Sequence, residues 1–243
     1  MTLGYPTLTH SIQVIKALED SGADLLEIGF PFSDPLADGP TIQRASQEAI
    51  EKGIQFQDFF KAMRLLRKNG LKVPVLLFSY FNPIFHYGVS RTARELFEVG
   101  CEGAIVPDLP PEEGRDLEAS FRKFNLSLVY LVAPTTSHDR MKMIAQRSSG
   151  FVYYVSLRGV TGVRRALPHD LTSNLKVLRS LTNKPILVGF GISTPKQARQ
   201  VCRMSDGVVV GSAILNAVRK SNGRMDGIKK FTRSLVDSVR SAE

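Results

Sequence analysis

Two carboxylates near the start of the chain have the residue types and surroundings for acid–base chemistry. Glu27 lies inside the apolar run Asp24–Phe30, and Asp38 lies in the following loop, between the three prolines Pro31, Pro35 and Pro40. The prolines restrict the backbone of this loop, so they hold its acidic side chains in place. Two carboxyl groups in such different environments acquire different pKa values, which allows one to act as an acid and the other as an anion.

The alternation of side chains along Asp24–Phe30 predicts the direction in which Glu27 points. In a strand, Leu26, Ile28 and Phe30 would share one face and pack against helices, while Leu25, Glu27 and Gly29 would share the other. A carboxylate inside a parallel strand costs several kcal/mol unless it is paired, hydrogen-bonded or protonated. Gly29 lacks a side chain and would leave room for a ligand beside the acid.

Each acid also has a purely structural alternative. Glu27 could form an ion pair or a hydrogen bond that serves only the core. Asp38 precedes Gly39 and Pro40, so it could cap a helix that begins near Thr41. Asp38 by itself favours neither interpretation, and the case for catalysis depends on its combination with Glu27.

Glycines after the last three apolar runs predict a phosphate site. Glycine lets backbone N–H groups approach an anion closely, and the N-terminus of a helix favours negative charge. Ser212 is expected to open such a helix. The three segments are Gly159–Gly162, Gly189–Ser193, which contains Gly191, and Gly211 with Ser212. Their joint position predicts a phosphorylated substrate, with an apolar second half to its pocket.

The elements that must position these residues form a repeated strand-then-helix pattern. Short apolar runs of this kind are typical of parallel strands that are covered on both faces. Apolar residues at helical spacing predict helices over Thr9–Ser21, Asp58–Lys68, Arg91–Val99, Glu112–Phe124 and Leu171–Leu181. The expected strands are Met1–Gly4, Asp24–Phe30, Pro74–Tyr80, Gly103–Leu109, Ser127–Pro134, Phe151–Leu157, Pro185–Gly191 and Gly207–Ser212.

Eight strands alternating with helices in 243 residues predict a single (β/α)8 TIM-barrel domain over residues 1–243, of the α/β class. A doubly wound open sheet is the alternative, and the number of units favours the closed barrel. In a barrel of this kind the functional residues gather at the carboxyl ends of the strands. Glu27, Asp38 and the glycine segments all fall at such ends.

Composition excludes several classes of function. The net charge is +9, but the basic residues are dispersed, without the clustered footprint of a nucleic-acid-binding protein. No apolar run reaches the roughly 18 residues that span a bilayer, and no signal peptide is recognisable, so we expect a cytoplasmic protein. The four histidines show no metal-ligand spacing, and Cys101 and Cys202 are isolated thiols that fit a reducing compartment.

The segment Leu26–Pro40, LEIGFPFSDPLADGP, resembles the signature of tryptophan synthase α subunits. The resemblance continues in order along nearly the whole chain. It implies a TIM barrel that, as a lyase, performs a retro-aldol cleavage of indole-3-glycerol phosphate to indole and glyceraldehyde 3-phosphate. The other matching segments are Thr2–Pro6, Ser79–Pro83, Val106–Pro110, Ala133–Ser137, Gly159–Gly162 and Gly189–Ser193.

The same resemblance implies roles for individual residues. Glu27 would move the protons, and Asp38 would accept the indole N–H and stabilise the charge on the ring. Tyr80 and Tyr153 would contact the substrate, although both could equally be core aromatics. Thr161 would lie in a mobile loop and orient Asp38. The phosphate contacts would be Gly162, Gly191, Gly211 and Ser212.

The family resemblance further implies a β-subunit partner in an α2β2 heterotetramer. This subunit would need no cofactor, because pyridoxal phosphate would belong to the β partner, which receives the indole. The Asp34 loop and the segment Tyr80–Ser90 would form the interface, where Phe81 and Phe85 could be exposed or buried. Two departures from the family pattern are a shortened N-terminus and Arg158 beside Gly159. The shortened N-terminus leaves a second hypothesis open, a catalytically weak or inactive subunit that acts as an allosteric activator of the β partner. A third hypothesis is a different phosphate-binding barrel.

Overall fold

The computed structural model describes residues 1–155, 170–189 and 191–242, and its strands pair in parallel throughout. They form two four-stranded sheets in the orders β1-β2-β3-β4 and β5-β6-β7-β8. The strands are β1 Leu26–Gly29, β2 Val75–Phe78, β3 Gly103–Ile105, β4 Ser127–Val129, β5 Leu131–Val132, β6 Val152–Val155, β7 Ile186–Gly189 and β8 Gly207–Val208. Each strand lies within a predicted run.

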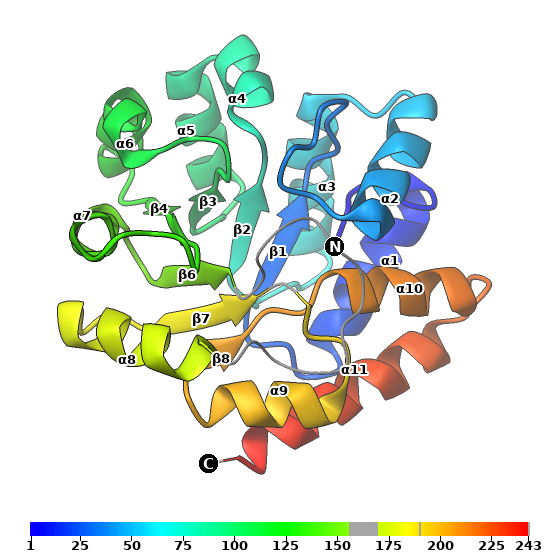
Figure 1. Cartoon of the computed structure of the whole chain (residues 1–243). Coiled ribbons are helices and arrows are strands. Elements are labelled where there is room, and N and C mark those ends of the chain that lie inside the picture. The colour runs from blue at the N-terminus through cyan, green and yellow to red at the C-terminus, as the bar shows by residue number, and fades with distance from the viewer. Residues whose placement is uncertain (156–169, 190, 243) are drawn as a thin grey trace.

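The two sheets are parts of one (β/α)8 barrel, with the strands at the centre and the helices around them (Figure 1). The predicted strand Ser127–Pro134 is divided into β4 and β5 at Tyr130, whose carbonyl accepts a hydrogen bond from the Tyr153 amide at 3.2 Å. The predicted strand Met1–Gly4 is wrong in extent. Only Thr2 pairs with Gly29, because Gly4 has a φ of 85° and turns the chain away.

The helices surround the strands in alternation with them, as the apolar spacing predicts. They are α1 Leu8–Glu19, α2 Pro40–Glu51, α3 Phe56–Lys68, α4 Phe81–Tyr87, α5 Val89–Glu98, α6 Arg115–Arg122, α7 His138–Arg147, α8 Leu171–Leu181, α9 Pro195–Cys202, α10 Ser212–Lys220 and α11 Met225–Arg240. The predicted helix Glu112–Phe124 is wrong at its start: the 3-10 turn η1 Pro111–Glu113 and then Gly114 precede α6. A Cβ atom on Gly114 would lie 1.8 Å from the Tyr130 hydroxyl, so glycine is required there.

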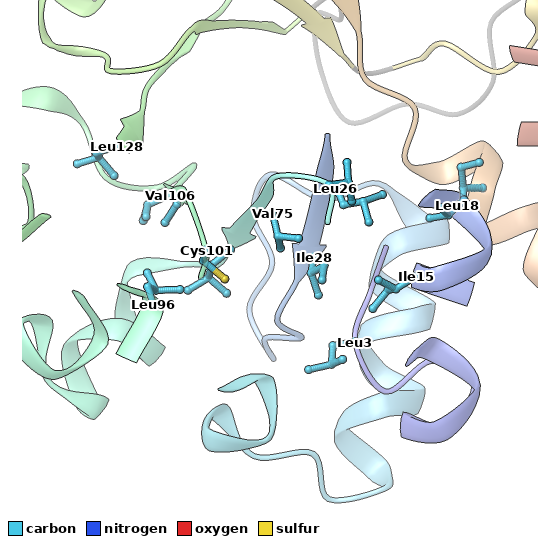
Figure 2. Packing of buried hydrophobic residues seen from close by; sticks show 14 of the residues in the cluster. Leu3, Ile15, Leu18, Leu26, Ile28, Val75, Leu96, Cys101, Val106 and Leu128 are labelled. Atoms are coloured by element: carbon cyan, nitrogen blue, oxygen red, sulfur yellow. The ribbon is translucent and has the colours of Figure 1, made fainter. Parts of the chain in front are cut away.

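The apolar side chains separate into an outer and an inner core. Outward-facing strand residues pack against the helices, and Figure 2 shows Leu26, Ile28 and Val75 of the strands among Ile15 and Leu18 of α1. The inner core fills the barrel itself. It contains Leu76, Ile105, Val129, Phe151 and Tyr153, with the partly buried Leu25, Phe78, Leu131, Val155, Leu187 and Val209 packed against them. The prediction that Leu26 and Ile28 face the helices while Leu25 faces inward is confirmed.

Two cationic side chains bind backbone carbonyls at the amino edge of the barrel. Arg67 of α3 donates to the carbonyls of Leu71 and Val73, both at 2.9 Å, and to that of Gly100 at 2.6 Å. Lys184, just before β7, donates to three carbonyls around the end of α7. Each side chain thereby holds in place the segments that lead into the neighbouring strands. Both side chains lie at the edge of the barrel opposite the carboxyl ends of the strands, where the active site is predicted.

Among the helices that the structure describes, none combines the length and the apolar character that crossing a membrane requires.

Arg67→Met should lower the free energy of unfolding by about 2–3 kcal/mol, because it leaves carbonyl groups without the donor that they share. The matched control is Arg64→Met on the same helix, since the half-exposed Arg64 side chain forms an ion pair with Glu95 at 3.0 Å and, among the described residues, binds no backbone carbonyl. That substitution should cost at most about 1 kcal/mol. Urea-induced unfolding of both variants measures the difference, and equal midpoints would contradict the structural role of Arg67.

Candidate active site

Glu27 lies on β1 and points into the barrel, as the alternation predicts. Its Oε1 atom is buried and has no hydrogen-bond partner among the described residues. Burial raises the pKa of Glu27 to about 7, and the positive charge of the Met1 ammonium, which donates to the Glu27 carbonyl at 2.6 Å, acts in the opposite direction. The purely structural alternative, a paired or hydrogen-bonded core acid, therefore finds no side-chain partner in the described part of the chain.

Tyr153 on β6 belongs to the inner core and shares the interior of the barrel with Glu27. It is 3% exposed, and its pKa is raised by burial and by the negative charge of Glu27. A Cβ atom on Gly189 would lie 2.1 Å from the Tyr153 hydroxyl. Gly189 thus makes room for the tyrosine ring, a function that the sequence analysis missed when it grouped this glycine with the phosphate loops. The sequence pattern contains no signal for such a contact between strands.

Asp38 is buried in the loop that follows β1. Its backbone N–H donates to the Pro35 carbonyl at 3.0 Å, and its own carbonyl accepts a hydrogen bond from Gln43 at 2.9 Å. The interpretation of Asp38 as a helix cap is wrong. The cap of α2 is Gly39, and no side chain makes a capping hydrogen bond there. The Asp38 carboxyl is thus available for other work.

Burial also sets the acidity of Asp38. It raises the pKa of the carboxyl to about 6, against a lowering effect of the hydrogen bond from the Tyr80 side chain. This pKa and the pKa of about 7 for Glu27 both lie near neutrality. Acid–base groups act most effectively when their pKa values are close to the working pH. The two acids therefore meet this requirement, and the loop with Asp38 starts from the strand that carries Glu27.

Tyr80 links the end of β2 to the loop of Asp38. Its hydroxyl accepts a hydrogen bond from the Ala37 amide at 2.9 Å, and its ring stacks on Phe32 with the centroids 5.3 Å apart. The sequence analysis expected a pocket wall or a core aromatic and did not predict this contact. No sequence spacing could have indicated it, because Tyr80 and Ala37 come from different strand–helix units.

The expected phosphate residues also lie at the carboxyl ends of their strands. Gly191 follows β7 with a φ of 80°, and Gly211 is the N-terminal cap of α10. Ser212 is the first residue of that helix, as predicted, and no acidic residue occupies its first turn. Thr161 and Gly162, like Arg158, lie outside the described residues. Gly191, Gly211 and Ser212 thus share the edge of the barrel with Glu27 and Asp38.

Comparison with known proteins relates the chain to one family over nearly its full length. A family model described as tryptophan synthase alpha chain matches residues 1–241. The tryptophan synthase alpha chain of Dehalococcoides mccartyi is 39% identical over 239 residues, which cover 98% of this chain and 93% of that protein. That of Aquifex aeolicus is 41% identical over 241 residues, which cover 99% of this chain and 91% of that protein.

Solved structures show the same relation. Tryptophan synthase of Mycobacterium tuberculosis superposes with a TM-score of 0.92 at 34% identity, covering 99% of this chain and 90% of that chain. The tryptophan synthase α subunit of Legionella pneumophila superposes with a TM-score of 0.90 at 35% identity, with 99% and 91% covered. The family model, the sequence relatives and the superposed barrels agree. The chain belongs to the tryptophan synthase alpha chain family, whose members cleave indole-3-glycerol phosphate to indole and glyceraldehyde 3-phosphate in tryptophan biosynthesis.

Proposed function

We propose that Glu27 moves the protons in the cleavage of indole-3-glycerol phosphate. The observation that carries the proposal is the buried Oε1 of Glu27, which faces the barrel interior with no partner among the described residues. Cleavage of the bond from indole C3 to the glycerol chain needs a proton at C3 and the loss of a proton from the adjacent hydroxyl. Protonated Glu27 donates to C3, and the resulting carboxylate takes the hydroxyl proton, so the acid is regenerated in each cycle.

Asp38 has the complementary role of an anion. As C3 receives its proton, positive charge develops on the ring, and an ionised Asp38 that accepts the indole N–H stabilises this charge. Its pKa of about 6 keeps Asp38 mainly ionised at neutral pH, while the pKa of about 7 leaves Glu27 partly protonated. The different pKa values support this division of work between the two acids.

The remaining pocket residues bind the two ends of the substrate. The rings of Tyr80 and Tyr153 form walls around the indole, and Thr161 orients Asp38. Gly162, Gly191, Gly211 and Ser212 hold the phosphate group. Support comes from the uncharged first turn of α10 and from the left-handed backbone of Gly191. A helix N-terminus and nearby glycine amides together favour a phosphate.

The partner in this proposal is the tryptophan synthase β subunit, in an α2β2 heterotetramer in the cytoplasm. Pyridoxal phosphate belongs to the β subunit, and this chain works with its own side chains alone. Leu36, in the loop after β1 that carries Asp38, is 82% exposed, and Phe85 on α4 is 66% exposed. Large apolar side chains exposed in this way are typical of a protein interface. Phe81 instead packs partly against the core.

Glu27→Gln should lower kcat by at least about a hundredfold, since glutamine can neither donate nor accept the transferred proton. Binding of a non-cleavable indole-alkyl phosphate should stay measurable by calorimetry. The exposed acid Glu113 provides the control, because Glu113→Gln makes the same change from carboxylate to amide at an exposed position on η1, in a different strand–helix unit from Glu27 and Asp38. A Glu27→Gln enzyme with an unimpaired cleavage rate, assayed with the β subunit, would refute the assignment.

The value of kcat/KM should be highest between about pH 6 and pH 7. Asp38 must be ionised, so activity is lost as the pH falls through about 6, and Glu27 must be protonated, so activity is lost as the pH rises through about 7. The substrate phosphate titrates near pH 6 as well. The pH profile of the residual activity of Asp38→Asn distinguishes the Asp38 carboxyl from the substrate phosphate. In this variant the fall of kcat/KM at low pH should become smaller, and an unchanged fall would assign that titration to the substrate.

Ser212→Asp should raise KM for the substrate at least about tenfold, because a carboxylate in the first turn of α10 repels the phosphate. The control is Ser221→Asp at the C-terminal cap of the same helix, which adds the same charge at the opposite end. Steady-state assays, together with inhibition by glycerol 3-phosphate, measure the effect. Equal KM values in the two variants would count against a phosphate site at Ser212.

A further inference from the structure

A small cavity opens on the outside of the barrel, between the neighbouring helices α5 and α6 (Figure 1). Its volume is about 310 Å³, which is at the lower end of the range for small-molecule sites. The described residues that line it are Ser90, Arg91, Arg94, Ser120, Lys123 and Phe124. None of these six belongs to the candidate active site, so the cavity needs an explanation of its own.

The cavity is positively charged. Arg91 and Arg94 lie on α5, Lys123 is the C-terminal cap residue of α6, and the described residues that line the cavity include no acid. The Lys123 ammonium forms no ion pair within the described part of the chain. Arg94 and Glu98 are 3.9 Å apart, and both side chains are at least half-exposed, so this ion pair contributes little. Two of the three cations are therefore available to a ligand.

The third cation, Arg91, is held in place by its neighbours. Its guanidinium lies over the Tyr87 ring, 4.1 Å from the centroid, and its Nε atom is 3.4 Å from Glu95. Glu95 also accepts hydrogen bonds from the Tyr87 hydroxyl and from Arg64, so its negative charge is shared among three donors. The ion pair uses one of the five N–H groups of Arg91. A cation that is already fixed in this way loses little conformational entropy when a ligand binds.

Two hydroxyl groups and a helix N-terminus add hydrogen-bond donors to these charges. The Oγ atoms of Ser90 and Ser120 are 3.5 Å apart, and Ser120 is only 7% exposed. Ser90 and Arg91 belong to the first turn of α5, which contains no acidic residue and receives no capping hydrogen bond from a side chain. Hydroxyl groups and the amides of a helix N-terminus both donate to anions. An anion with several acceptor oxygens, such as a phosphate, matches this set of donors and cations.

An aromatic surface adjoins the charged part of the cavity. Phe124 lines the cavity, and its ring centroid is 5.5 Å from that of Phe97 on α5. Phe97 is 57% exposed, so a large apolar side chain is left in water beside the cations. A flat ring that packs on Phe124 would remove part of this apolar surface from water. The cavity therefore offers a ligand one anionic and one aromatic contact.

We infer that the cavity between α5 and α6 is a second binding site, which takes a small aromatic phosphate ester. The phosphate forms ion pairs with Arg94 and Lys123 and accepts a hydrogen bond from the Ser120 hydroxyl. The ring of the ligand packs on Phe124. The site uses none of the residues that the proposed cleavage needs, so it stands or falls independently of the proposed function.

Titration of the full chain with phenyl phosphate, followed by the NMR shifts of its backbone amides, tests the inference. The amides of Ser90, Arg91 and Ser120 should shift saturably, with a Kd of about 1 mM or lower. The amides of Gly211 and Ser212 report binding at the active site in the same spectra, so the two sites are measured separately. An absence of saturable shifts at the first three amides would overturn the inference.

Lys123→Gln should raise this Kd about tenfold, because the phosphate loses a charged partner. The matched control is Arg122→Gln, which removes one positive charge from the preceding, exposed position of α6 but does not line the cavity. It should leave the Kd unchanged. Ser120→Ala should also raise the Kd about tenfold, since it removes the buried donor. Equal effects of Lys123→Gln and Arg122→Gln would reduce the binding to a general attraction between anions and a basic surface, which contradicts the inference.

The two halves of the probe test the two halves of the site. Inorganic phosphate and phenol should each bind at least about tenfold more weakly than phenyl phosphate, because each makes only one of the two contacts. Inorganic phosphate that binds as tightly as phenyl phosphate would leave only an ion site, and phenol that binds as tightly would leave only an apolar one. Either result would overturn the assignment of an aromatic phosphate ester.

Two other occupants of the cavity have distinct signatures. A polyglutamate peptide that shifts the same amides at a lower Kd than phenyl phosphate would make the cavity a docking surface for an acidic protein. A weakened affinity for the β subunit in Lys123→Gln, but not in Arg122→Gln, would make the cavity part of the subunit interface. Both results would contradict a small-molecule site, for which Lys123→Gln should leave indole formation with the β subunit unchanged.

Discussion

The burial of one carboxyl group inside an apolar barrel is the constraint on which the candidate site depends. Glu27 has a raised pKa because the interior of the barrel withholds water and, within the described residues, supplies no side-chain donor to Oε1. Inner residues such as Leu76 and Ile105 create this environment from neighbouring strands. The apolar core is therefore part of the chemistry, since it keeps a proton on Glu27 near neutral pH.

The second acid, Asp38, is buried as well, although it lies on a loop. Asp38 stands on a loop, where a carboxylate would normally be hydrated and free to move. Its backbone N–H donates to the Pro35 carbonyl and its carbonyl accepts a hydrogen bond from Gln43, and these two contacts hold the backbone that carries the acid. Exclusion of water thus raises the pKa of both acids, and backbone contacts keep the loop of Asp38 in place.

The sequence predicts those parts of the fold and site that depend on local pattern. The direction of Glu27 follows from alternation along one strand, and the start of α10 at Ser212 follows from a glycine before an apolar helix. Contacts between distant units are beyond such reasoning. One example is the hydrogen bond from the Ala37 amide to the Tyr80 hydroxyl, and another is the close packing of the Tyr153 hydroxyl against Gly189. Both contacts depend on the register of neighbouring strands. The true cap of α2, Gly39, was missed because aspartate and glycine are both common there.

The carbonyl groups that Arg67 and Lys184 bind have a consequence for how this enzyme responds to acid. An ion pair with a carboxylate disappears when the carboxylate is protonated, but a peptide carbonyl does not titrate in water at ordinary pH. The amino edge of the barrel therefore keeps these six contacts through the interval in which Glu27 and Asp38 change charge. Protons can therefore switch off the chemistry in a pH interval that leaves these six contacts of the scaffold unchanged.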